Sequence, residues 1–344
     1  SVSARLCSLM TALRGAVDRG RNASWYGNSV LSWCLLPLSL LVRFEVKRRR
    51  DQAPLKGATP DGVMVIVIGG LTVGGTGKTP VLIALGRWLQ HSGYRVGVIS
   101  RGYRSQALDE ARQVAPNDDS ASVGDEPLLI RRELEVPVVV GRDRLQALHT
   151  LIQDNAIDIV LSDDGLQHYQ LPRDLEIVVL DGQRGLGNGR LLPAGPLREP
   201  RERLEEVDWV LERNSDDPHS GFEYHISGAR HLASGRLVVW SDCLGQWGDQ
   251  TLTAMTALGQ PEQFFQMLTT QGLTVKTVSL PDHDVIMPQH LTGIVTETVL
   301  ITEKDAIKLS GSIDSRLWVV EIEVQLPASL LTGLHDKLPT RVQT

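Results

Sequence analysis

The chain has 344 residues, of which 42% are hydrophobic and 22% are charged, and its formal net charge at pH 7 is −6. This length exceeds what one ordinary hydrophobic core accommodates, so we expect two domains. The negative charge argues against a dedicated nucleic-acid binder. The widely spaced Cys7, Cys34 and Cys243 exclude a zinc ribbon and a disulfide framework.

An uncharged segment at residues 23–42 is the first predicted element. It is about as long as one membrane span, carries Trp25, Tyr26 and Trp33, and is flanked by basic residues. Polar residues dilute its hydrophobicity, so a helix lying in the membrane interface is an alternative to a spanning one, and a helix buried in a soluble core is a third. The basic cluster between residues 43 and 50 predicts that the rest of the chain is cytoplasmic. We predict a membrane-anchoring helical segment over residues 1–51.

A glycine-rich stretch follows a polar linker at residues 52–61. Residues 64–68 form an apolar run typical of a buried parallel strand, and residues 81–89 have the periodicity of a helix. The sequence GGLTVGGTGKT at 69–79 lies between them and matches the phosphate-binding pattern G-x-x-x-x-G-K-[ST], except that Thr72 replaces the first glycine. Glycines let backbone N–H groups point at phosphate oxygens, Lys78 would reach the β- and γ-phosphates, and Thr79 would bind Mg²⁺.

Strands and helices alternate beyond this loop. We expect strands at 94–99, 136–140, 157–161, 175–180 and 209–212, with helices at 128–134 and 145–155. Strands that are apolar on both faces and separated by helices predict a doubly wound, mostly parallel α/β sheet. Residues 52–213 would form this P-loop nucleotide-binding domain, with its ligand beyond the carboxyl ends of the strands.

Acidic residues follow two of these strands. Asp163 and Asp164 end an apolar strand, where P-loop enzymes place a carboxylate that binds Mg²⁺ directly or through water. The alternative is a turn capped by Asp and ended by Gly165. Asp125 should lie at the same edge, where a carboxylate orients or deprotonates a hydroxyl group. The alternative for Asp125 is an ordinary helix cap.

A long Gly- and Pro-containing loop at 183–203 is expected to be functional because structureless loops of this length are uncommon in compact domains. Its Glu199 is a further candidate Mg²⁺ ligand. Guanidinium groups that follow strands or lie in this loop suit phosphates, although each alone is also compatible with a solvated charge. These arginines are Arg101, Arg142, Arg144, Arg190 and Arg198.

A second, smaller α/β domain is predicted over residues 214–344. It has expected strands at 236–240, 275–280 and 298–302, and helices at 262–270 and 288–292. His283 lies between Asp282 and Asp284, and a carboxylate can hold its imidazole so that it orients a base across the cleft. A polar surface residue is the alternative.

Eight motifs in a fixed order carry a resemblance to a known family. They are TVGGTGKTP, SRGYR, VGDEP, GRDR, SDDGLQH, LLPAGPLREP, PDHD and TEKDAIKL. Together they resemble the tetraacyldisaccharide 4′-kinase family of lipid A biosynthesis over nearly the whole chain. The resemblance implies transfer of the ATP γ-phosphate, with Mg²⁺, to the 4′-hydroxyl of tetraacyldisaccharide 1-phosphate, giving lipid IVA. It further implies two α/β/α lobes and a place on the cytoplasmic face of the bacterial inner membrane.

Residue roles follow from the resemblance. Asp125 would be the catalytic base, paired with His283 and assisted by Lys78 and Asp164. The sequence has Asp284 after His283, where many family members have a second histidine. We expect a monomer whose partners are the lipid substrate and the membrane surface. ATP would contact Thr72, Val73, Gly74, Gly75, Thr76, Gly77, Lys78 and Thr79; Mg²⁺ would contact Thr79, Asp163, Asp164 and Glu199; and the acceptor would contact Arg101, Tyr103, Arg142, Arg144, Gln167, His168 and Arg198.

Two other functions are weighed against a lipid kinase. A nucleotide switch or metallochaperone of the P-loop class should carry D-x-x-G and [NT]-K-x-D, whereas this chain has Asp164-Gly-Leu-Gln167 and Thr302-Glu-Lys-Asp305. A soluble small-molecule kinase does not account for the uncharged segment at 23–42.

Overall fold

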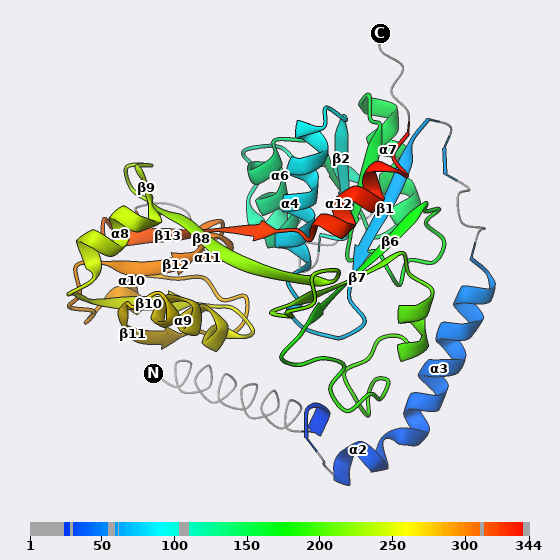
Figure 1. Ribbon diagram of the computed structural model, residues 1–344, viewed down its shortest axis with the longest axis horizontal. Coiled ribbons are helices and arrows are strands. Elements are labelled where there is room, and N and C mark those ends of the chain that lie inside the picture. The colour runs from blue at the N-terminus through cyan, green and yellow to red at the C-terminus, as the bar shows by residue number, and fades with distance from the viewer. Residues whose placement is uncertain are drawn as a thin grey trace.

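The computed structural model describes residues 24–27, 30–53, 59–60, 62–102, 110–309 and 313–339. Two α/β lobes lie side by side and are connected by two long strands (Figure 1). Tyr103 and the part of the predicted anchoring segment before residue 24 lie outside the described residues.

Each strand and helix predicted from the sequence overlaps an element of the structure, and the structure has further elements that were not predicted. The strands are β1 (Met64–Gly69), β2 (Val96–Ser100), β3 (Arg112–Gln113), β4 (Val138–Val140), β5 (Ile159–Asp163), β6 (Leu175–Asp181), β7 (Trp209–Arg213), β8 (Gly221–His231), β9 (Leu237–Val239), β10 (Thr251–Thr256), β11 (Thr274–Ser279), β12 (Val299–Thr302) and β13 (Leu317–Gln325). The helices are α2 (Val30–Cys34), α3 (Leu36–Asp51), α4 (Lys78–His91), α5 (Ser120–Val123), α6 (Asp125–Leu134), α7 (Arg144–Asp154), the 3₁₀-helix η1 (Arg201–Glu205), α8 (Trp240–Trp247), α9 (Pro261–Thr270), α10 (Pro288–Leu291), α11 (Glu303–Ala306) and α12 (Ala328–His335).

The sheet of the first lobe is parallel except at its β3 edge. Its strand order is β8-β7-β6-β1-β5-β2-β4-β3, and β3 alone among these described strands pairs antiparallel, with β4. The carboxyl ends of β1, β2, β5 and β6 therefore meet at one edge. The predicted mostly parallel α/β sheet is confirmed.

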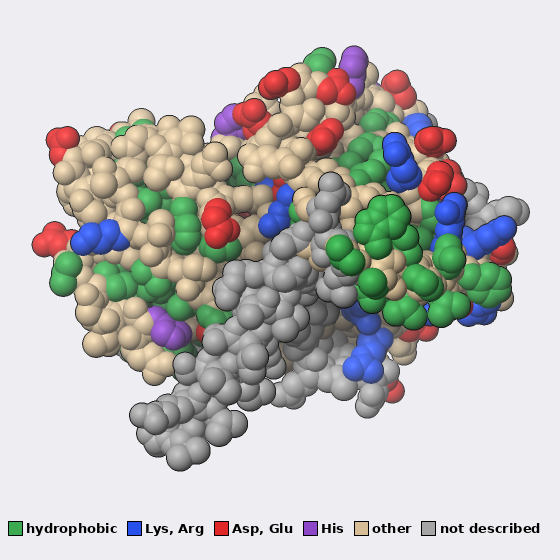
Figure 2. Space-filling view, turned by 90° about the horizontal axis from the view of Figure 1, so that it is seen from below, with side chains coloured by type: hydrophobic (Ala, Val, Ile, Leu, Met, Phe, Trp, Pro, Cys, Tyr) green, Lys and Arg blue, Asp and Glu red, His purple; other side chains and the backbone are tan. Residues whose placement is uncertain are grey.

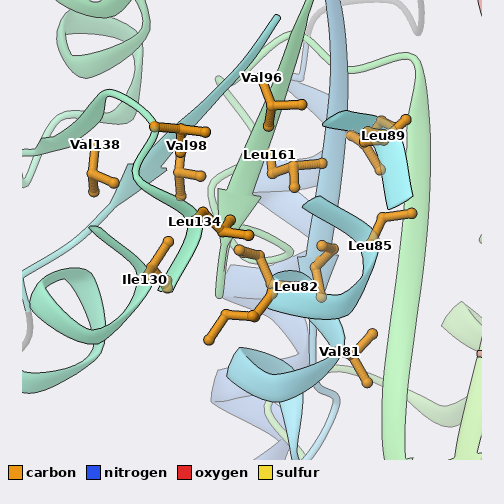
Figure 3. Close-up of a cluster of buried hydrophobic side chains, with 14 of the residues drawn as sticks. Val81, Leu82, Leu85, Leu89, Val96, Val98, Ile130, Leu134, Val138 and Leu161 are labelled. Atoms are coloured by element: carbon orange, nitrogen blue, oxygen red, sulfur yellow. The ribbon is translucent and has the colours of Figure 1, made fainter. Parts of the chain in front are cut away.

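Two hydrophobic cores cover the two faces of this sheet, as the period-2 alternation of a strand requires. In β1, Ile66 and Ile68 belong to one core, and Val65 and Val67 belong to the other. Figure 3 shows the first core, where side chains of α4 and α6 pack against those of β2, β4 and β5. Helix α7 covers the opposite face. Helices on both faces make the sheet doubly wound.

Strand β8 connects the lobes. It begins parallel to β7 in the first lobe and continues antiparallel to β13, with a register shift between Glu321 and Ile322. The remaining sheet of the second lobe has the parallel order β11-β10-β12-β13. The strands β3, β8, β10 and β13 were not predicted from the sequence. The predicted division between residues 213 and 214 falls in the turn just before β8 and stays a prediction.

The last helix returns to the first lobe after the second lobe is complete. Leu330 and Leu334 of α12 are fully buried in the core that contains Ile66 and Ile68. A Cβ atom on Gly333 would lie 2.9 Å from the Trp209 ring, so α12 packs closely on β7. Helix α12 therefore contributes to the same hydrophobic core as β1.

Helices α2 and α3 run along the outside of the first lobe (Figure 1). Their buried side chains are serines: Ser32 donates a hydrogen bond to the Ala194 carbonyl oxygen at 2.5 Å, and Ser39 donates one to that of Leu191 at 2.8 Å. None of the helices in the described part of the chain combines the length and the hydropathy needed to cross a bilayer.

Leu334→Ala tests the contribution of α12. Removing a fully buried Leu side chain leaves a cavity, so we expect the free energy of unfolding to fall by about 2–4 kcal/mol. Urea denaturation followed by circular dichroism measures this change. Thr332→Ala, at an exposed position of the same helix, should stay within about 0.5 kcal/mol of wild type. Equal, small effects would show that α12 is not part of the core.

Candidate active site

The loop between β1 and α4 has the backbone conformation that its glycines allow. Gly74 has φ +117° and Gly77 has φ +93°, values that residues other than glycine rarely adopt. A Cβ atom on Gly77 would also lie 2.2 Å from the Tyr224 hydroxyl oxygen on β8. Glycine is therefore required at the last loop position for both conformation and space.

The long loop at 183–203 supports the first half of this phosphate-binding loop. The Val73 N–H donates to the Pro196 carbonyl oxygen at 2.9 Å, and the Arg198 N–H donates to that of Leu71 at 2.7 Å. Thr72 and Leu197 form an isolated antiparallel bridge. The predicted functional loop thus lies directly beside the predicted nucleotide-binding residues.

Lys78 begins α4 and reaches back toward the end of β5. Its Nζ lies 3.7 Å from Asp164 Oδ1 and would lie 3.5 Å from a Cβ atom on Gly70. Arg198 Nη1 binds the other oxygen, Asp164 Oδ2, at 2.8 Å. Burial opposes ionisation of Asp164, but Lys78 and Arg198 outweigh it and lower its pKa to about 2.

Asp163 has the opposite electrostatic environment. Its side chain is buried, and burial together with the charges of Glu126 and Asp164 raises its pKa to about 7. Asp163 Oδ2 accepts a hydrogen bond from Ser100 Oγ at 2.9 Å. The two adjacent carboxyl groups therefore differ in protonation near neutral pH.

The residues at this edge fit a divalent cation. Asp163 Oδ1 and Asp164 Oδ1 are buried and have no hydrogen-bond partner among the described residues, and the same is true of Thr76 Oγ1. No group of three or more His, Cys, Asp or Glu side chains in the described part of the chain is arranged to hold a metal alone. Mg²⁺ binds through one or two carboxylates and takes its other ligands from phosphates and water, so these residues suit it when a nucleotide is present.

A second group of polar side chains joins the two lobes. Asp125 is the first residue of α6, and its Oδ2 lies 3.2 Å from Nδ1 of His283. Burial raises the pKa of Asp125, but the His283 hydrogen bond and nearby Lys308 and Lys304 outweigh it and lower the pKa below its usual range. Asp125 is therefore an ionised carboxylate at neutral pH, oriented by an imidazole from the other lobe.

The next residue of α6 makes a parallel contact. Glu126 Oε1 lies 2.8 Å from Lys304 Nζ of α11. Gln260, which precedes α9, donates a hydrogen bond to the Gly75 carbonyl oxygen at 3.3 Å. Four of these residues had no predicted role: Glu126, Lys304, Gln260 and Tyr224. Glu126 nevertheless lies in the motif VGDEP and Lys304 in TEKDAIKL.

Gln167, His168 and Glu199 lie behind the acidic turn. Gln167 Nε2 donates to Glu199 Oε1 at 2.8 Å, and Glu199 is fully buried with Arg203 at 3.4 Å. Burial and nearby Arg144 lower the pKa of His168 to about 4, so this imidazole is neutral at pH 7. The assignment of Glu199 to Mg²⁺ and of Gln167 and His168 to the acceptor stays a prediction.

The remaining predicted arginines occupy different environments. Arg190 donates a hydrogen bond to Ser32 Oγ of α2 at 2.8 Å, and its guanidinium lies over the Trp33 ring. Arg101 and Arg142 are exposed beyond β2 and β4. Arg144 is buried and donates hydrogen bonds to the carbonyl oxygens of Gly141 at 2.9 Å and Asp163 at 3.0 Å. Its guanidinium thus stabilises the backbone of the acidic turn. The proposed contacts of Arg101, Arg142 and Arg144 with the acceptor stay predictions.

A parallel sheet whose β1 leads through a glycine loop and Lys78 into α4, with carboxylates at the end of β5, defines a P-loop protein. A profile of the tetraacyldisaccharide-1-P 4′-kinase family matches residues 31–339. The chain therefore belongs to this family, as the motifs indicated.

Named relatives cover almost the same length. The chain is 40% identical over 326 residues to a tetraacyldisaccharide 4′-kinase of Alcanivorax borkumensis, covering 94% of this chain and 98% of the relative. It is 42% identical to one of Pseudomonas paraeruginosa, covering 91% and 95%. The crystal structure of LpxK from Aquifex aeolicus in complex with ATP matches with a TM-score of 0.73 at 27% identity, covering 90% of this chain and 99% of that one.

Asp163→Asn should change how stability depends on pH. Because the pKa of Asp163 is about 7 in the fold, against 3.8 for an unperturbed Asp in the unfolded chain, its contribution to stability is complete below about pH 4 and is lost as the pH rises through 7. The stability of Asp163→Asn relative to wild type should therefore increase over this range. Urea unfolding with a metal chelator present measures it, and Ser100→Ala, which keeps the carboxyl group, should retain the wild-type trend. A constant difference between wild type and Asp163→Asn would contradict the assignment.

Proposed function

We propose that this protein transfers the γ-phosphate of ATP to the 4′-hydroxyl of a tetraacyldisaccharide 1-phosphate. The observation that carries the proposal is the Asp125–His283 pair, which crosses the lobe boundary in a chain of the tetraacyldisaccharide-1-P 4′-kinase family. Its relatives are named for this reaction, and a structural neighbour of the family was crystallised with ATP.

Phosphoryl transfer depends mainly on positioning and on neutralising charge. The N–H groups of the glycine loop and the N-terminus of α4 would bind the phosphates, and Lys78 would leave Asp164 for the γ-phosphate oxygens. Arg198 would keep Asp164 ionised after that exchange, since it binds the opposite carboxylate oxygen at 2.8 Å.

Asp125 would accept the proton of the acceptor hydroxyl group. The hydroxyl oxygen would attack the γ-phosphorus, and ADP would leave. The low pKa of Asp125 makes its carboxylate ionised at neutral pH, and His283 fixes its orientation. When bound, Mg²⁺ would neutralise charge on the phosphate oxygens. Asp163, Asp164 and Thr79 are the residues that we propose hold it.

Asp125→Asn tests this assignment. The amide cannot accept the proton, so we expect kcat to fall by about 10²- to 10⁴-fold while the Kd for ATP changes little. A radiolabelled phosphate transfer assay with the 1-phosphorylated disaccharide lipid measures kcat, and calorimetry measures ATP binding. Asp154→Asn makes the same change at an exposed position of α7 and should behave as wild type. Wild-type turnover by Asp125→Asn would remove Asp125 from the mechanism.

We also propose that α2 and α3 lie on the inner membrane at its cytoplasmic face. Six apolar side chains of these helices are exposed, whereas Ser32 and Ser39 are buried against the first lobe. The exposed residues are Val30, Trp33, Leu38, Leu40, Leu41 and Phe44, each at least 50% exposed. Figure 2, which views the molecule from the side of α2, shows hydrophobic side chains gathered at one end with Lys and Arg side chains beside them. A four-chain lipid acceptor stays in the bilayer, so the enzyme has to bind there.

Replacing both Leu40 and Phe44 with Asp tests the membrane surface. Two apolar side chains would be lost from the bilayer contact and two charges gained, so binding to vesicles with anionic lipids should fall at least tenfold. Vesicle co-sedimentation measures the binding. It is done at low salt, because salt screens the attraction between the basic residues of α3 and the anionic lipids. Leu237→Asp, at an exposed apolar position of β9, is the control. Equal binding by the double variant would exclude this surface.

A further inference from the structure

Residues 302–308 carry the motif that the proposed mechanism has not used. Helix α11 and the residues beside it contribute Lys304, Asp305 and Lys308, three charged side chains that are all partly or fully buried. A buried charge destabilises the fold unless it is paired or hydrogen-bonded, so the partners of these three side chains indicate what they hold in place.

Asp305 hydrogen-bonds to the turn at Thr256 and Ala257, which in turn binds the backbone of His283. Its carboxylate is fully buried and accepts hydrogen bonds from Thr256 Oγ1 at 2.7 Å and from the Ala257 N–H at 3.0 Å. The carbonyl oxygen of the same Ala257 accepts the N–H of His283 at 2.9 Å. Asp305 and the backbone of His283 are thus both hydrogen-bonded to Ala257, which links them.

Lys308 holds the other side of His283. Its Nζ donates a hydrogen bond to the Asp284 carbonyl oxygen at 2.6 Å and lies 3.5 Å from Asp305 Oδ1. His283 has φ +65°, a left-handed conformation that is uncommon for residues other than glycine. Such a conformation persists only where its surroundings hold it in place, and Asp305 and Lys308 supply those contacts.

Lys304 connects this arrangement to the first lobe. Its Nζ lies 2.8 Å from Oε1 of Glu126, the residue after Asp125 on the first turn of α6. Two consecutive carboxylates of α6 therefore each contact a side chain from the second lobe. One contact is the Asp125–His283 pair, and the other fixes α11 relative to α6.

We propose that Lys304, Asp305 and Lys308 are positioning residues that hold the His283 imidazole against Asp125. Asp305 and Lys308 set the backbone of His283 within the second lobe, and Lys304 sets that lobe on α6. The role in turnover rests on the proposed function of Asp125, because a base misplaced by about 1 Å loses much of its effect.

A double-mutant cycle tests the role of Lys304. Lys304→Met should lower kcat about tenfold with the KM for ATP within about twofold, and Lys304→Arg should recover most of the loss. In a His283→Ala background, Lys304→Met should cost less than about twofold, because the residue to be positioned is gone. Lys276→Met removes the same charge from an exposed position of β11 and should match wild type.

Two outcomes would overturn the proposal. Additive losses in the cycle would mean that Lys304 acts on the reaction independently of His283. A loss in Lys276→Met equal to that in Lys304→Met would mean that only the charge of the second lobe matters.

Hydrogen exchange gives a readout that does not depend on turnover. In Lys308→Met, the amides of His283 and Asp284 should exchange at least tenfold faster, while the amides of β1 keep their wild-type protection. Unchanged exchange at 283–284 would refute the positioning role of Lys308. If the wild-type protein failed to phosphorylate the lipid, the proposed function would fall, and the exchange result would still decide whether this segment holds His283.

Discussion

Negative charge is concentrated at the edge of the sheet where this protein must bind still more negative charge. Asp163, Asp164 and Glu126 are close enough to shift one another's pKa. The protein balances them in different ways: Asp163 takes up a proton near neutral pH, whereas Asp164 stays ionised between Lys78 and Arg198. A triphosphate that draws Lys78 away requires a replacement cation, and the unpartnered carboxylate oxygens suit one.

The second constraint is that the site is divided between two lobes. Gln260, His283 and Lys304 come from the second lobe and contact the glycine loop or α6 of the first. Strands β8 and β13 connect the lobes through an antiparallel ladder with one register shift, and the Tyr224 hydroxyl of β8 lies against Gly77.

The loop at 183–203 relates the phosphate site to the proposed membrane surface. Asn188 and Ala194 contact Ser32 of α2, while Pro196 and Leu197 contact the glycine loop. Polar contacts thus occupy the inner side of α2 and α3, and six of their apolar side chains are exposed. This arrangement would present an acceptor held in the bilayer to the side of the first lobe that carries the P-loop.

The sequence alone determined the features that depend on short-range patterns. Apolar runs identified β1, β2, β5 and β6, because a strand buried on both faces is apolar at most positions, and the glycine loop with Lys78 identified the phosphate site. The strands β8, β10 and β13 went unrecognised, although β13 (LWVVEIEVQ) alternates apolar and polar residues as a strand does; the sequence could not show that it pairs with β8. The position of helix α12 was likewise not predictable from the sequence, because it depends on packing into the core of the first lobe.

The same distinction applies within the site. Asp163 and Asp164 were recognisable because a strand end places them, and the family resemblance supplied the pairing of Asp125 with His283. Only the tertiary structure decided the 3.2 Å contact between residues 158 apart in sequence, the pairing of Glu126 with Lys304, and the burial of Glu199 beside Gln167. Charge balance and lobe contacts act through space, and no local pattern of residue types specifies which distant side chains will meet.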